Sequence, residues 1–62
     1  MATILSSETT GTITRVIVSV PEISDATMLE AEALAQADTG MDPIDLIACP
    51  ESTTIEVHLL EG

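Results

Sequence analysis

Cys49 and His58 are the residues of this 62-residue chain whose side chains are best suited to nucleophilic catalysis. Such a nucleophile needs a base beside it and a third group that orients the base, and His58 is the only histidine. Cys49 precedes Pro50 among acidic residues, which disfavours the reactive thiolate. Neither a Gly-x-Ser-x-Gly motif nor a glycine-rich phosphate loop is present. We therefore expect no catalytic residue, interpret Cys49 as a packing residue, and predict that the protein is not an enzyme.

The number and spacing of the Cys, His and Asp residues disfavour metal and cofactor binding. One cysteine and one histidine exclude an internal disulfide and a zinc site with four Cys or His ligands. Asp38, Asp42 and Asp45 lie close together around Gly40, but they lack the Asp-x-Asp-x-Asp-Gly spacing of a calcium loop. We interpret Asp42 and Asp45 as helix caps and His58 as a solvated neighbour of Glu56. The sequence predicts no metal site and no cofactor.

The charge balance restricts the kind of partner. The chain has one Arg, no Lys and eleven Asp plus Glu, so its formal net charge is −10. Direct binding of nucleic acid or of an anionic membrane requires several basic side chains, and only Arg15 is available. No apolar segment reaches the roughly 20 residues that span a bilayer, and no signal peptide is recognisable. We expect a cytoplasmic protein whose partner is a protein with a basic surface.

Two strands and a helix are predicted from residue patterns. Residues 12–20 are rich in β-branched side chains, with apolar residues on both faces, as in the central strand of a sheet. Ser24 is a good N-cap for a helix that ends near Asp38, before Gly40. Residues 53–60 alternate, with Ile55, Val57 and Leu59 expected to point inward. An apolar stretch at residues 2–6, followed by turn-forming residues, predicts an N-terminal hairpin.

Residues 42–49 allow two interpretations. Asp42 followed by Pro43 resembles a helix start and favours a helical turn, whereas an edge strand at residues 44–48 is the alternative. With the turn, residues 1–62 form one α+β domain in which a small antiparallel sheet packs on one central helix. Its expected order is β-β-α, a short helical turn, and β.

Part of this pattern resembles the ribbon-helix-helix repressors. The resemblance covers a strand at residues 15–22, a helix at residues 29–35, and a turn and second helix at residues 40–47. That family inserts its strand into the major groove between basic flanks, and this chain is acidic there. A strand at residues 53–60 also replaces the end of the second helix. No DNA-contacting residue is transferred from the family.

The small core predicts self-association. Aromatic residues are absent, and a domain of this size buries only about 60% of the surface that its unfolded chain exposes. Repulsion among the carboxylates weakens the compact state further. We therefore expect a homodimer.

The functional hypothesis follows from the acidity. We expect an inhibitor that mimics DNA and occupies the basic nucleic-acid-binding surface of a host protein, as in the anti-defence or anti-CRISPR proteins of phages and mobile elements, acting in the host cytoplasm. The expected contact residues are the acids of the helix and of the segment that follows it: Glu30, Glu32, Asp38, Asp42 and Asp45. The alternative is a small structural or regulatory subunit, antitoxin-like or salt-adapted, whose acidity serves solubility.

Overall fold

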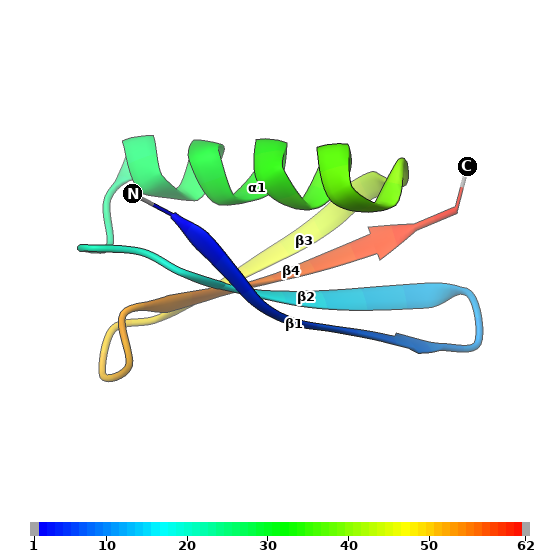
Figure 1. Cartoon of the computed structure of the whole chain (residues 1–62), viewed down its shortest axis with the longest axis horizontal. Coiled ribbons are helices and arrows are strands. Elements are labelled where there is room, and N and C mark those ends of the chain that lie inside the picture. The colour runs from blue at the N-terminus through cyan, green and yellow to red at the C-terminus, as the bar shows by residue number, and fades with distance from the viewer. Residues whose placement is uncertain (1, 62) are drawn as a thin grey trace.

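A computed structural model describes residues 2–61 as one four-stranded antiparallel sheet with a helix on one face (Figure 1). In chain order, the elements are β1 (Thr3–Thr10), β2 (Ile13–Ser19), α1 (Asp25–Thr39), β3 (Asp42–Cys49) and β4 (Thr54–Leu60). The spatial order of the strands is β1-β2-β4-β3, which places β2 and β4 in the centre. The predicted α+β class and the central position of the β-branched strand are confirmed.

The core lies between the sheet and the helix. Alternate residues of the two central strands point toward α1, and they are fully buried: Val16 and Val18 from β2, and Ile55, Val57 and Leu59 from β4. Ala31 and Ala35 meet them from the helix, and their small side chains let the helix approach the sheet closely. The inward and outward faces of residues 12–20 and 53–60 are thus as predicted.

The helix has the two ends that its sequence indicates. The Ser24 hydroxyl accepts a hydrogen bond from the Thr27 N–H at 3.2 Å, and the Thr27 hydroxyl accepts one from the Ser24 N–H at 2.8 Å. Together these bonds form a capping box. At the other end, Gly40 adopts φ +71°, a left-handed conformation that costs glycine little, and its N–H donates to the Gln36 carbonyl oxygen.

The predicted helical turn after the helix is wrong, because residues 42–49 form the edge strand β3. Leu46 pairs with Val57 and Ala48 with Ile55, so the segment completes a hairpin with β4. The local signal of Asp42 and Pro43 is outweighed by this pairing, since Pro43 can be accommodated on an edge strand beside the irregularity in register between Pro43 and Asp45. The second helix implied by the ribbon-helix-helix resemblance is therefore replaced by a strand.

The first hairpin is longer than the sequence indicates. β1 continues through the residues expected to form the turn, up to Thr10, and the chain reverses at Gly11, which has φ +64°. Its register shifts between Ile4 and Ser6, so both edge strands carry an irregularity. Such irregularities hinder the addition of further strands at a sheet edge.

Candidate functional site

The molecule has two surfaces of different charge, one on the helix and one on the sheet. The helix carries four acids and no basic residue: Asp25, Glu30, Glu32 and Asp38, which we call the helix acids. The sheet face opposite α1, which we call the open face, is not covered by any other element among residues 2–61 (Figure 1). Arg15 and His58, the only Arg and the only His of the chain, both lie on β strands and point to this open face.

Glu30 and Glu32 lie on opposite flanks of the helix. Each residue of a helix advances about 100° around the axis, so two side chains that are two residues apart point about 200° apart. Leu29 lies on the outer side between them and is 65% exposed, next to Ala33 on the following turn. Glu30 also accepts a hydrogen bond at 3.1 Å from the Ala2 N–H to its Oε1. The helix thus presents a small apolar ridge with a carboxylate on each side.

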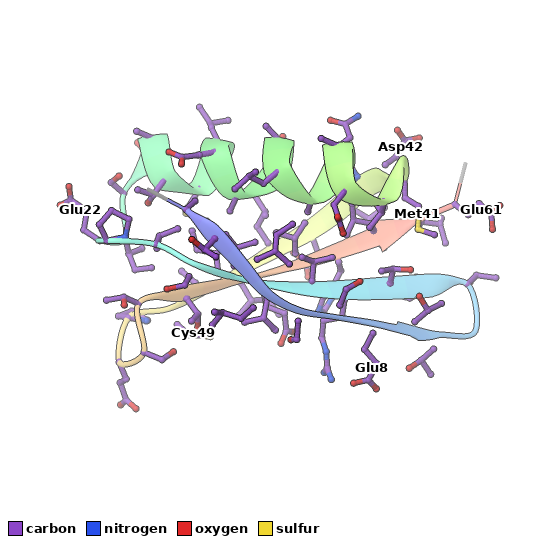
Figure 2. The ribbon with its side chains drawn as sticks, viewed as in Figure 1. Glu8, Glu22, Met41, Asp42, Cys49 and Glu61 are labelled. Carbon is purple, nitrogen blue, oxygen red and sulfur yellow. The ribbon has the colours of Figure 1, made fainter. Side chains whose placement is uncertain are left out.

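Asp38 and Asp42 lie at the C-terminal end of the helix. Asp38 is in its last turn, and Asp42 follows after the Gly40 cap, beside the end of α1 in Figure 2. Their carboxylates are close to the negative end of the helix dipole, and no basic residue occupies the last turn. Neither carboxylate is therefore stabilised by the helix dipole or by a basic residue of the last turn.

Asp45 lies on the other layer of the molecule. It pairs with His58 across β3 and β4, and therefore belongs to the open face. Its Oδ1 accepts a hydrogen bond from the Leu46 N–H at 3.0 Å. The interpretation of Asp42 and Asp45 as helix caps is wrong, since both lie in a strand. The five expected contact residues are thus divided among the helix flanks, the end of the helix and the open face.

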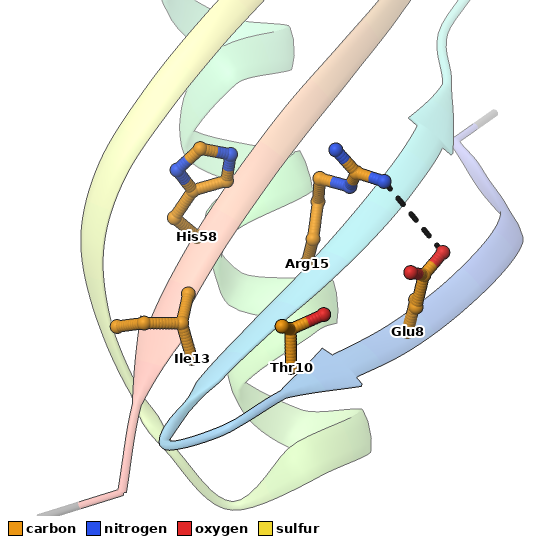
Figure 3. A pocket seen from close by; sticks show the side chains of 5 residues that line it. All are labelled: Glu8, Thr10, Ile13, Arg15 and His58. Carbon is orange, nitrogen blue, oxygen red and sulfur yellow. Dashed lines mark ion pairs between the residues drawn. The ribbon is translucent and has the colours of Figure 1, made fainter.

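A row of charged residues crosses the open face. Strand pairing places Glu8, Arg15, His58 and Asp45 side by side on the four strands. Figure 3 shows three of them in line. Because this row arises from pairing between distant segments, it has no signature in the sequence; only the outward positions of Arg15 and His58 are visible in the alternation.

Arg15 and His58 each have a carboxylate neighbour. Arg15 lies 3.6 Å from Glu8 (Nη2 to Oε2) and 4.0 Å from Glu56 (Nε to Oε1). His58 Nε2 lies 2.6 Å from Glu56 Oε2, so the predicted proximity of His58 and Glu56 is confirmed. His58 is less solvated than predicted, because neighbouring strands cover part of its side chain. The side chains of Glu56 and His58 are about three-quarters buried, at 22% and 26% exposure. Glu56 therefore links Arg15 and His58.

A shallow hollow of about 180 Å³ lies beside this row, lined by Glu8, Thr10, Ile13, Arg15 and His58. Cys49 is distant from it, because it pairs with Thr54, four residues before His58 along β4. At about 3.3 Å per residue, that separation is about 13 Å. Cys49 and His58 therefore do not form a nucleophile and base pair in this structure.

Among the described residues, no three His, Cys, Asp or Glu side chains are grouped to hold a metal ion. Within residues 2–61, the helix is too short and too polar to cross a bilayer. No family model, curated protein or solved structure matches the chain.

Proposed function

We propose that this chain is a non-enzymatic binding protein whose acidic helix occupies a basic, nucleic-acid-binding cleft of a protein and thereby inhibits it. The observation that carries the proposal is the separation of charge: the only Arg and the only His lie on the open face, so the helix acids have no cationic side chain on their own element. Such a surface attracts a basic partner and accelerates association.

The spacing of the helix acids fits one strand of nucleic acid better than a duplex. The 15 residues of α1 extend about 22 Å at about 1.5 Å each. Over that length, a duplex presents about thirteen phosphates and one strand about six. Four helix acids are closer to the charge of a single strand. The proposed mimicry is therefore of one phosphate backbone.

The outward ridge and its flanks indicate how the helix would bind. Leu29 and Ala33 would contact the floor of the cleft, while Glu30 and Glu32 would face basic side chains on its two walls. A flat basic surface would contact the carboxylate on only one flank of the helix, whereas a cleft would contact the carboxylates on both flanks. Asp38 and Asp42 extend the acidic surface beyond the end of the helix, and Asp45 lies outside it. The proposed site of action is the cytoplasm, that of the host if a phage encodes the protein.

The test is competition with nucleic acid. A basic nuclease or a CRISPR effector is titrated with the protein in the presence of labelled single-stranded DNA, at several salt concentrations. We expect the protein to displace the DNA, and the affinity to fall as salt rises. The triple variant Glu30→Gln, Glu32→Gln, Asp38→Asn should lose displacement.

The matched control removes the same charge elsewhere. The variant Asp45→Asn, Glu51→Gln, Glu61→Gln also loses three negative charges, but none of them lies on the helix. It should displace DNA like the unmodified protein. Equal losses in the two triple variants would contradict a helix-centred site, and displacement that is independent of salt would contradict electrostatic mimicry.

The second candidate function, a regulatory or salt-adapted subunit, is favoured by the distribution of the remaining acids. Figure 2 shows Glu8 on the side of the sheet away from the helix, Glu22 at one end of the molecule and Glu61 at the other. Acids on every side serve solubility more directly than recognition of one partner. The response of stability to salt separates the two functions, because a salt-adapted subunit folds only at high salt.

A further inference from the structure

The open face combines apolar side chains with charges of both signs, unlike the helix. Its exposed or half-buried apolar residues surround the charged row: Ile13, Ile17, Ile47, Cys49 and Leu60. Ile47 and Leu60 are 42% and 37% exposed. In a chain whose fully buried core consists of Val, Ala, Ile and Leu with one Thr, a second layer over this face would bury further apolar surface.

We propose that the open face is the interface of a homodimer, in which two copies pack sheet against sheet. The charge distribution selects a second copy as the occupant. A molecule of net charge −10 repels its copy wherever both surfaces carry only acids. On the open face, Arg15 and His58 lie among Glu8, Asp45 and Glu56, so this face alone offers a copy both signs of charge.

The register of the strands selects one orientation of the two copies. A two-fold axis parallel to the strands would place β1 over β3 of the second copy and hence Glu8 over Asp45, two like charges. A two-fold axis perpendicular to the strands instead places each strand over the same strand of the second copy, running in the opposite direction. The neighbouring row of the open face contains the pair Ile17 and Glu56. If the axis passes between this row and the charged row, it places His58 over Glu56 of the second copy and Arg15 over Ile17.

The second orientation is therefore the interface we infer. Each copy contributes one His58 and one Glu56, so the complementary contact is made twice around the axis. Two sheets packed in this way keep their strands within about 30° of each other, at a separation of about 10 Å. The helices and their acids then point outward on both sides of the dimer, which leaves them free for the proposed partner.

The size of the face is sufficient for a dimer. Four strands about 4.8 Å apart, with about seven residues at about 3.3 Å each, cover about 19 × 23 Å. Side chains project from the sheet, so the accessible surface of the face is larger than this projected area. Two such faces together therefore bury about 1,000 Å², the lower bound for a specific interface. We expect a dimer that dissociates on dilution.

The first test is the mass of the protein in solution, by sedimentation equilibrium from micromolar to millimolar concentration. We expect a monomer–dimer equilibrium. In the inferred orientation Ile47 lies over Asp45 of the second copy. The variant Ile47→Asp therefore places two carboxylates against each other at two points around the axis, and should raise the dissociation constant by about a hundredfold. Leu29→Asp adds the same charge on the helix, 65% exposed, and should leave the equilibrium nearly unchanged.

Three outcomes would overturn the interface: an unmodified protein that is monomeric throughout, an Ile47→Asp variant that dimerises normally, or equal weakening by both variants. If Ile47→Asp does not fold, a sample that mixes isotope-labelled and unlabelled unmodified protein decides by NMR. Contacts between the Ile17 methyl groups of one copy and the Arg15 side chain of the other support the interface, and their absence refutes it. A monomer that still displaces DNA would overturn the dimer and leave the proposed function standing.

Discussion

At the scale of single residues, stability depends on a few aliphatic side chains. Leu59 is a fully buried residue of the core. Truncation to Ala removes its apolar contacts and leaves a cavity, which costs about 2 to 5 kcal/mol. A domain of this size has about 3 to 9 kcal/mol in total. We therefore expect Leu59→Ala to lose a large fraction of the free energy of unfolding, as measured by urea denaturation followed by circular dichroism.

Leu29→Ala is the matched control, because it makes the same chemical change at a residue that is 65% exposed. Ala has at least the helix propensity of Leu, so the free energy of unfolding should change by less than about 0.5 kcal/mol. Comparable losses in the two variants would mean that Leu29 is covered in solution, and that the helix surface is already an interface.

At the scale of elements, the helix carries one acid at each end, and the two ends should respond in opposite ways. Asp25 is in the first turn, where its charge is favourable to the helix dipole, and Asp38 is in the last turn, where it is unfavourable. Asp25→Asn should lower the free energy of unfolding, and Asp38→Asn should raise it, each by about 0.3 to 1 kcal/mol at low ionic strength. Thermal melts at low and high salt measure both effects.

The pair is its own control, since both changes remove one negative charge and since Asp and Asn have similar helix propensities. If relief of general repulsion dominates, both variants become more stable, which would contradict a local dipole effect. The same Asp38→Asn change is part of the triple variant that should abolish binding. Loss of binding in that variant, together with retained or increased stability, would separate function from folding.

The elements that were predictable from the sequence are those whose signals are local. Ser24 and Gly40 mark the helix ends by cap chemistry, and the alternation of Ile55, Val57 and Leu59 marks a half-buried strand. β3 was not predictable in this way, because its strand state depends on pairing with β4, while Asp42 and Pro43 locally favour a helix start. Long-range pairing outweighs local propensity there.

The candidate site was less predictable than the fold, for a geometric reason. Glu30 and Glu32 are two residues apart in sequence, but the helix turns them to opposite flanks. Asp42 and Asp45 are three apart, but Asp42 lies beside the end of the helix, whereas Asp45 pairs with His58 on the open face. Proximity in sequence therefore did not produce one acidic face, whereas residues as distant as Glu8 and Asp45 share a row.

At the scale of the whole molecule, ten net negative charges are confined to a body of 29 × 17 × 16 Å. At about 0.01 M salt the Debye length is about 30 Å, so every carboxylate interacts with every other; at about 1 M it is about 3 Å, and only contact pairs interact. Unfolding separates these charges, so screening should stabilise the folded state. We expect the urea midpoint to rise over this range of salt and then to level off.

The salt concentration at which the chain folds distinguishes the two candidate functions. A binding protein must be folded at moderate ionic strength, where its electrostatic attraction to a basic cleft is strong, so the chain should already be folded at about 0.1 M salt, with a Debye length of about 10 Å. A salt-adapted subunit should instead be unfolded in dilute buffer and fold only at molar salt. An equivalent concentration of sucrose, which strengthens burial without screening charge, controls for general stabilisation. Folding that requires molar salt would therefore remove the proposed inhibitor and leave the salt-adapted subunit as the explanation of the acidity.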